Sequence, residues 1–211
     1  MKFDLLIVVP VILAYLIGSI PTSVWVGRMF YNVDVRNEGS KNAGATNTIR
    51  VLGLKAGIPV LIFDIFKGWL AVFIIRFFEF SDMSLEVNIY LQIVMGMAAV
   101  AGHIFPLYVG FRGGKGVATI AGVGIALFPI GIFIVLGIFL LCLLISRIVS
   151  LSSLIAAISF PFIVIFLLGN PHLPLILLSV IVGVFIPLTH RKNIKRLIKG
   201  EESKLSFRKK K

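Results

Sequence analysis

Cysteine and acidic residues are both scarce in this chain. Only one of its 211 residues is a cysteine, and only nine are Asp or Glu, against 21 Lys or Arg. The lone thiol, Cys142, excludes an internal disulfide and most cysteine-based metal sites. It lies inside a Leu/Ile/Phe run, so we expect it to be a packing residue.

Charged residues of either sign are also few. They make up 14% of the chain, whereas hydrophobic residues make up 58%, and the mean hydropathy is +1.04. A soluble domain carries about 25% charged residues. The apolar runs do not alternate with polar residues, as the strands of a membrane barrel would. The composition therefore predicts an all-α, polytopic membrane protein built as one helical bundle.

The net charge of +12 would suggest a nucleic-acid partner if the protein were soluble. A membrane protein gives the charge a simpler origin, because Lys and Arg collect on the cytoplasmic side and meet anionic lipid. We therefore expect membrane lipid as a partner and no nucleic acid.

Apolar runs that can cross about 30 Å of hydrocarbon predict seven spans, of which the fourth is short. Segment 117–146 is too long for one span, and Pro129 and Gly131 predict a turn that divides it into two helices, the first of them short. The other five spans are 5–26, 58–78, 89–109, 151–168 and 173–189. The first of these is broken near residues 18–21. One tilted helix over 117–146 is the alternative, and it would give six spans.

Charge orients these spans. One face receives the tail after His190, with ten Lys or Arg, and eight further cations: Arg28, Arg36, Lys41, Arg50, Lys55, Arg112, Lys115 and Arg147. The other face receives Lys2 and Arg76 together with Asp4, Glu79, Asp82 and Glu86. The positive-inside rule places the first face in the cytoplasm, with the N-terminus outside and the C-terminus inside. Six spans would put the basic segments on opposite faces, which the charge count disfavours.

These spans define the expected domain organisation. We expect residues 1–190 to form a single transmembrane helical domain whose polar loops lie on the cytoplasmic face. Residues 191–211 form a basic cytoplasmic tail, most simply a solvated anchor on anionic headgroups.

The first polar island runs from Gly39 to Asn47 and adds Arg50. Glycines at 39 and 44 allow positive φ, and successive N–H groups in such a loop form a concave anion nest. Ser40, Thr46 and Asn47 add neutral donors, while Arg50 can clamp a phosphate with two hydrogen bonds. An ordinary interhelical loop with glycine turns is the alternative.

The second island, Gly113-Gly114-Lys115-Gly116, leads directly into a predicted helix. The first N–H groups of a helix and its dipole favour an anion, and Lys115 supplies a point charge. A positive-inside loop with helix-capping glycines would have the same sequence.

Two further polar groups precede or follow later spans. Arg147 comes before Ser150, Ser152 and Ser153, and we favour helix capping over ligand binding for these serines. His190 and Asn193 share one face if the last span continues as a helix, although a histidine at a membrane edge is more often an interfacial residue than a catalyst.

Three polar residues fall inside predicted spans. Asp64 and Lys67 are spaced to form an intramembrane ion pair, which we expect to be structural. His103 lies deeper in its span than His190 does, and it is the stronger candidate for a functional role, because a polar group at that depth must find partners.

Together the islands resemble one family, the bacterial acyl-phosphate:glycerol-3-phosphate acyltransferases called PlsY. The resemblance is carried, in order and spacing, by GSIPT at 18–22, GSKNAGATN at 39–47 with Arg50, AGHIFP at 101–106, FRGGKGVAT at 111–119, SRIVSLSS at 146–153, and HRKNIKRL at 190–197 with GEE at 200–202. It implies a seven-helix bundle of the bacterial inner membrane with a cytoplasmic active site.

The resemblance implies transfer of a fatty acyl group from acyl phosphate to the sn-1 hydroxyl of glycerol 3-phosphate. The products are lysophosphatidate and phosphate, and the step belongs to phospholipid synthesis. No cofactor and no metal are implied, and the enzyme that supplies acyl phosphate becomes a potential functional partner.

Site residues also follow from the resemblance. Those implied around glycerol 3-phosphate are Ser40, Arg50, Lys115, His190 and Asn193. Those implied nearer the acyl phosphate are Gly44, Thr46, Asn47, Gly114 and Ser153, and Gly39, Asn42 and Gly113 complete the substrate-binding set. Lys41, Ala43 and Ser152 depart from the family pattern, so the path of the first loop and the choice between Ser152 and Ser153 stay open.

No catalytic triad or strong protein base stands out in the sequence. We therefore expect direct attack by the glycerol hydroxyl without an acyl-enzyme, with either His190 or an oxygen of the acyl phosphate accepting the proton. A phosphate- or lipid-handling transporter is the alternative. It should show internal repeats, and no convincing repeat is found.

Overall fold

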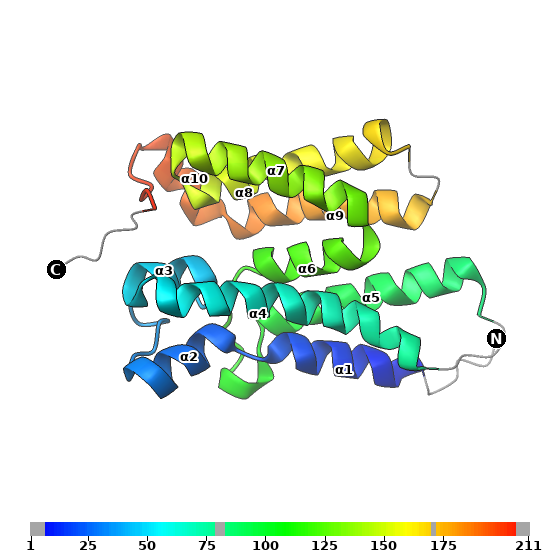
Figure 1. Cartoon of the computed structure of the whole chain (residues 1–211), viewed down its shortest axis with the longest axis horizontal. Coiled ribbons are helices and arrows are strands. Elements are labelled where there is room, and N and C mark those ends of the chain that lie inside the picture. The colour runs from blue at the N-terminus through cyan, green and yellow to red at the C-terminus, as the bar shows by residue number, and fades with distance from the viewer. Residues whose placement is uncertain (1–6, 79–82, 170–171, 206–211) are drawn as a thin grey trace. The chain divides into compact units, whose positions relative to one another are not determined.

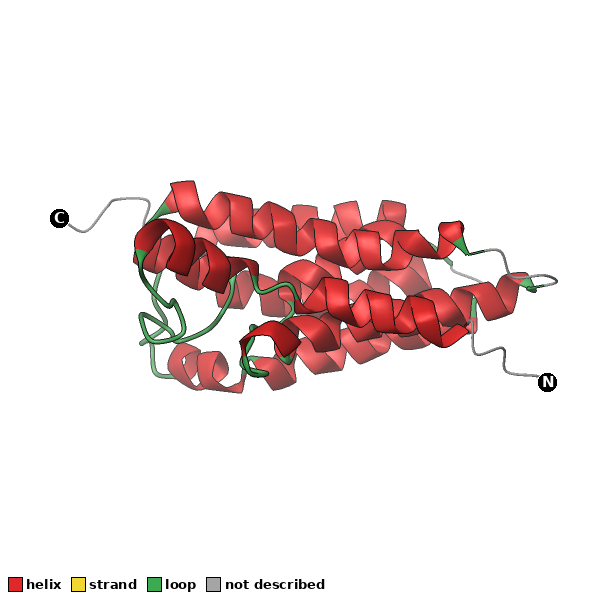
Figure 2. Ribbon diagram, turned by 90° about the horizontal axis from the view of Figure 1, so that it is seen from below, coloured by secondary structure: helices red, strands yellow, loops and turns green. Residues whose placement is uncertain are grey.

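The computed structural model describes residues 7–78, 83–169 and 172–205 (Figure 1). Every regular element in these ranges is a helix (Figure 2). The chain forms two compact units, residues 1–127 and residues 128–211. Lys2, Asp4, Glu79 and Asp82, which entered the orientation argument, lie outside the described residues, as do residues 206–211 of the tail.

The first unit is built around three long helical segments. Its elements are α1 (Val8–Ser19), α2 (Thr22–Tyr31), α3 (Ala45–Leu52), α4 (Leu54–Phe73) with the 3-10 turn Ile74–Phe77, α5 (Leu85–Ile104), the 3-10 turn Leu107–Val109, and α6 (Val117–Leu127). Helix α1 packs against α5, and α4 packs against α3 and α6. The predicted break near Pro21 is confirmed, because α1 ends at Ser19 and α2 begins at Thr22.

Two helix pairs of this unit approach closely through glycine. A Cβ at Gly18 of α1 would collide with the backbone of Ala99 on α5. A Cβ at Gly68 of α4 would collide with the backbone of Thr119 on α6. Small residues at such crossings let membrane helices approach until their backbones touch.

The second unit contains α7 (Pro129–Ser146), α8 (Val149–Phe162) continued by the π-helical turn Ile163–Leu167, α9 (Leu173–Thr189) and α10 (Arg191–Ile198). Helix α8 packs against both α7 and α9. The predicted division of segment 117–146 is confirmed, since Phe128 separates α6 from α7 and Pro129 opens α7.

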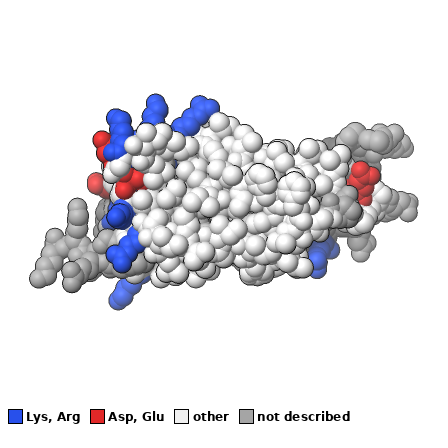
Figure 3. Space-filling view, turned by 90° about the horizontal axis from the view of Figure 1, so that it is seen from above, with Lys and Arg blue, Asp and Glu red and all other residues white. Residues whose placement is uncertain are grey.

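Within the described residues, five helical segments are long and apolar enough to cross a membrane, and α9 with α10 would make a sixth despite a 63° bend. Helix α6 has only 11 residues, well short of the roughly 20 that span hydrocarbon. In the face shown in Figure 3, Lys and Arg lie in separate groups, and the surface between them carries no charge. An all-α, multi-pass membrane protein is thus confirmed, while the count of seven spans and the sides of the termini stay predictions.

Candidate functional site

The first polar island, Gly39 to Asn47 with Arg50, is called the first motif loop. It is organised by Asn47, whose side chain is 1% exposed and lies in the first turn of α3. Its amide nitrogen donates to the carbonyls of Val35 at 2.7 Å and Glu38 at 3.1 Å. Its amide oxygen accepts from the Ser40 N–H at 2.8 Å. Asn47 therefore holds the backbone of the loop, and its amide is largely committed to that task.

The backbone of this loop corrects one prediction. Gly39 has the expected positive φ of 58°, but Gly44 has φ −150° and forms the N-cap of α3 in extended conformation. The second left-handed residue is instead Lys41, with φ 58°. Lys41 is not a glycine, the residue that adopts this conformation without strain, and it is one of the positions at which the loop departs from the resembled pattern.

Ser40, Lys41 and Arg50 are exposed polar residues of the first loop. Arg50 lies in the last turn of α3, one helical turn after Thr46, and its Cδ atom lies near Gly39. The loop N–H groups are partly used, because Lys41 donates to the Glu38 carbonyl and Gly44 donates to the Asn42 carbonyl. The loop is therefore not an open backbone nest, because at least two of its N–H groups are bonded within the loop.

The second polar island, Gly113 to Gly116, is called the second motif loop, and it runs back along the end of α5. Gly113 N–H donates to the Ile104 carbonyl at 3.0 Å, and Gly114 N–H donates to the His103 carbonyl at 3.2 Å. Gly116 has φ 82°, and α6 begins at the next residue, as predicted. The amides of Gly113 and Gly114 thus hold the loop in place. Lys115 follows directly, one residue before Gly116 and two before the start of α6.

Arg36 joins the two motif loops. Its guanidinium, 12% exposed, donates to the carbonyls of Val109 at 2.8 Å and Arg112 at 3.3 Å, and pairs with Asp34 at 2.8 Å. Hydrogen bonds from Arg36, with a further one from Arg28, hold the pKa of Asp34 far below its usual range despite partial desolvation. The two loops that carry Arg50 and Lys115 are therefore neighbours in the first unit.

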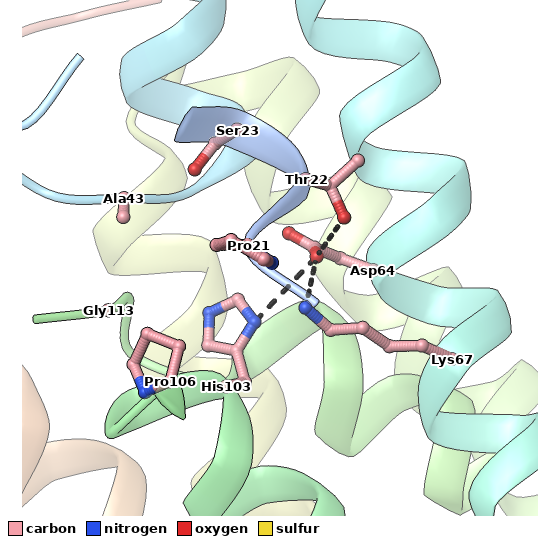
Figure 4. Close-up of a pocket in the computed structure, with 9 residues that line it drawn as sticks. All are labelled: Pro21, Thr22, Ser23, Ala43, Asp64, Lys67, His103, Pro106 and Gly113. Carbon is pink, nitrogen blue, oxygen red and sulfur yellow. Dashed lines mark hydrogen bonds and ion pairs between the residues drawn. The ribbon is translucent and has the colours of Figure 1, made fainter. Parts of the chain in front are cut away.

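Beneath these loops lies a small polar pocket (Figure 4). The predicted ion pair is confirmed, since Lys67 Nζ lies 2.6 Å from Asp64 Oδ1, and both side chains are almost fully buried. Thr22 Oγ1 donates to the same carboxylate oxygen at 3.3 Å, and His103 Nδ1 lies 3.7 Å from it. The pocket is lined by Pro21, Thr22, Ser23, Ala43, Asp64, Lys67, His103, Pro106 and Gly113.

In the second unit, Glu202 is the centre of a hydrogen-bond network. Its Oε1 accepts from Ser150 Oγ at 2.8 Å and from Asn193 Nδ2 at 2.7 Å, and its Oε2 accepts from Arg196 Nε at 2.6 Å. Desolvation raises the pKa of Glu202, but the bonds from Arg196, Asn193 and Ser150 outweigh it and lower the pKa overall. Glu202 thereby orients Asn193 and fixes the chain after α10 against α8.

His190 lies at the bend between α9 and α10 and is 4% exposed. Its Nδ1 lies 2.9 Å from the Ile186 carbonyl and 3.2 Å from Thr189 Oγ1. In the tautomer with the proton on Nδ1, the ring donates to that carbonyl and Nε2 is the accepting nitrogen. The last span does not continue as one straight helix to Asn193, because α9 and α10 meet at a bend of 63°. The side chains of His190 and Asn193 are both buried.

The serines at the start of α8 do not cap it, so that expectation is wrong. Ile148 is the N-cap residue, and no side chain caps the helix there. Ser152 and Ser153 lie inside the helix and donate to the carbonyls of Ile148 and Val149, each at 2.9 Å. Both hydroxyls are buried, so the geometry does not separate Ser152 from Ser153.

Sequence reasoning did not identify Asp34, Arg36 or Glu202 as organisers of the motifs. The signal for the first pair was present in the Asp34-x-Arg36 spacing directly before the first island. Glu202 could have been singled out as a carboxylate within a strongly basic segment. Across the described residues, no three His, Cys, Asp or Glu side chains lie close enough together to hold a metal ion.

Comparison with known proteins identifies close relatives. Residues 8–200 match the model of a family described as glycerol-3-phosphate acyltransferase. A glycerol-3-phosphate acyltransferase of Chlorobaculum tepidum is 45% identical over 93% of this chain and 95% of the relative. One from Pelodictyon phaeoclathratiforme is 43% identical, also over 93% of this chain and 95% of the relative.

Two crystal structures of PlsY, an integral membrane glycerol 3-phosphate acyltransferase, share the fold. The glycerol 3-phosphate form has a TM-score of 0.82 and 35% identity. The lysophosphatidic acid form has a TM-score of 0.80 and 34% identity. Each alignment covers 95% of this chain and 96% of the compared chain.

Proposed function

The chain belongs to the glycerol-3-phosphate acyltransferase family, and we propose that it uses acyl phosphate to acylate the sn-1 hydroxyl of glycerol 3-phosphate. It is a membrane acyltransferase of phospholipid synthesis, and its products are lysophosphatidate and phosphate. The observation that best supports the donor is the pairing of two basic motif loops by Arg36. Two polyanionic substrates must approach each other, and cations offset their repulsion.

The proposed chemistry is direct acyl transfer. The glycerol hydroxyl oxygen bonds to the carbonyl carbon of acyl phosphate, and the resulting oxyanion collapses as the bond to the phosphate oxygen breaks. Phosphate leaves with the electron pair, and the hydroxyl proton passes to an oxygen of that phosphate. The enzyme contributes alignment of the two substrates and stabilisation of developing negative charge.

Residue roles are proposed for each unit. In the first, Arg50 and Lys115 bind phosphate oxygens and Ser40 donates a hydrogen bond, while Asn47 acts through the loop that it organises. In the second, His190 and Asn193 bind glycerol 3-phosphate. The remaining proposed substrate contacts are Gly39, Asn42, Gly44, Thr46, Gly113, Gly114 and Ser153.

The donor is tested by supplying purified protein with acyl phosphate and labelled glycerol 3-phosphate. We expect equal amounts of lysophosphatidate and phosphate, and no phosphate release when glycerol 3-phosphate is omitted. Acyl-CoA and acyl carrier protein thioesters serve as alternative donors. Product from a thioester but not from acyl phosphate would refute the proposed donor, and uptake into liposomes without product would favour the transporter alternative.

We also propose seven spans in the bacterial inner membrane, with the N-terminus outside, the motif loops in the cytoplasm and residues 191–211 as a cytoplasmic tail. The charge asymmetry supports this orientation. In a Cys142→Ala background, an impermeant thiol reagent added outside intact cells should label Glu86→Cys and spare Lys41→Cys. Both positions are exposed. A cysteine at position 86 leaves Ser84, which caps α5, unchanged. The opposite labelling pattern would invert the topology.

A further inference from the structure

The imidazole of His103 lies between the buried ion pair and both motif loops (Figure 4). Its Nδ1 edge faces Asp64 at 3.7 Å. A Cβ added to Gly114 would collide with Nε2 on the other edge and would lie 2.6 Å from the carbonyl oxygen of Ala43. One side chain is thus close to α4, to the first loop at Ala43 and to the second loop at Gly114.

The backbone around His103 supports the same loop. His103 and Ile104 end α5, and their carbonyls accept the N–H groups of Gly114 and Gly113. The turn at these two glycines therefore rests directly on the last turn of α5, with the imidazole filling the space under Gly114.

The support below the imidazole is rigid. Lys67, paired with Asp64, also donates to the Ile20 carbonyl at 2.9 Å, which ties the pair to the break between α1 and α2. Among the described residues, His103 Nδ1 is one of three buried side-chain polar atoms without a hydrogen-bond partner. An unpaired buried polar atom destabilises a fold, so packing alone does not account for a histidine at this position.

We propose that His103 is a positioning residue for acyl transfer. Its imidazole, oriented by Asp64 and Lys67, sets the distance between the Gly113–Gly114 backbone and Ala43, and thereby fixes the second loop relative to the first. The ring acts through Gly114 and not on the reacting atoms. Gly114 must be a glycine because the imidazole occupies the space that a Cβ would need. This inference rests on the proposed function, because Gly114 of the second loop is assigned to acyl phosphate.

A double-mutant cycle tests the contact. His103→Ala, Gly114→Ala and the double variant are assayed for kcat and for the KM of each substrate. Each single change should raise the KM for acyl phosphate about tenfold, with a smaller effect on kcat. The double variant should be at least about fivefold better than the product of the two single effects, because the imidazole and the new methyl group compete for one space. Relief is partial, since the Ala43 carbonyl remains in place.

Gly113→Ala is the matched control. A Cβ there would meet the backbone carbonyls of His103 and Ile104 and the Cδ of Pro106, atoms that His103→Ala leaves in place. The effects of Gly113→Ala and His103→Ala should therefore multiply within about twofold. Absence of coupling at Gly114, or equal coupling at both glycines, would overturn the inference.

Two conservative variants keep the test decisive if His103→Ala does not fold. The amide of Gln reaches toward the Nε2 position, whereas the shorter Asn reaches only toward Nδ1. His103→Gln should recover the KM for acyl phosphate better than His103→Asn at equal melting temperature, and the reverse order would refute a contact through Gly114. Wild-type protein that cannot use acyl phosphate would refute the proposed function itself. Active wild-type protein with uncoupled positions 103 and 114 would refute only the role of His103.

Discussion

Replacing Arg36 by alanine should separate the two motif loops without removing any proposed substrate contact. The change deletes the bonds to the carbonyls of Val109 and Arg112, at 2.8 and 3.3 Å. One hydrogen bond from a charged donor contributes about 1.5–3 kcal/mol. The longer bond, to the Arg112 carbonyl, is exposed to water and adds little. We therefore take about 1.5–3 kcal/mol as the contribution of the two bonds together. That energy corresponds to about a tenfold to hundredfold loss in the population of correctly placed loops.

Two measurements check the Arg36 prediction. The KM for acyl phosphate should rise by about that factor, and amide hydrogen exchange in residues 107–116 should accelerate similarly, because local opening becomes easier. Arg28→Ala is the control, since Arg28 pairs with the same carboxylate from a side chain that is 55% exposed. Such an exposed pair contributes about 0–1 kcal/mol. Wild-type exchange and KM in Arg36→Ala, or equal damage from Arg28→Ala, would refute the reasoning.

Three further outcomes are expected. Arg50→Lys should reduce turnover about tenfold to a hundredfold, because lysine keeps the charge but cannot form a bidentate clamp, and near-normal kinetics would remove Arg50 from the site. His190→Ala should raise the KM for glycerol 3-phosphate as well as lower kcat, with partial recovery in His190→Asn or His190→Gln. A pure kcat loss that neither variant rescues, with the acid limb of the pH–rate profile gone, would instead make His190 the base. Glu202→Gln should lower the melting temperature at pH 7. Because the folded pKa of Glu202 is lowered, its stabilisation is present above the unfolded pKa of about 4.3 and is lost as pH falls through the folded value. The gap between Glu202→Gln and wild type should therefore close on acidification, and a constant gap would exclude the carboxylate charge as its cause.

Local patterns in the sequence predicted the features that depend on local chemistry. Pro21 and Pro129 lack an N–H group, and both lie where helices break. The spacing of Asp64 and Lys67 placed their side chains on one helical face, where they form the ion pair. The run of glycines before Val117 predicted the start of α6.

Features that depend on distant partners were missed. Arg36 and Val109 are 73 residues apart in the chain, and nothing near either residue announces their contact. Glu202 organises Ser150 across a separation of 52 residues. Glycine at position 44 suggested positive φ, but the start of α3 imposes an extended N-cap there instead. The serines of α8 failed as caps because their hydroxyls bond to carbonyls within the helix or, for Ser150, to Glu202.

The engagement of Gly113 and Gly114 with the end of α5 has a consequence for selectivity. Because those two amides are occupied, the proposed function assigns much of the recognition at the second loop to Lys115, and a lysine ammonium lacks the planar, two-pronged geometry of a guanidinium. Such a charge responds to how much negative charge a ligand carries, and far less to its shape. Its attraction is also screened, over a Debye length of about 8 Å at physiological ionic strength. Under the proposed function, discrimination among phosphate esters is then expected from the planar guanidinium of Arg50 and from neutral donors. Association at the second loop will follow the ionic strength of the surrounding solution.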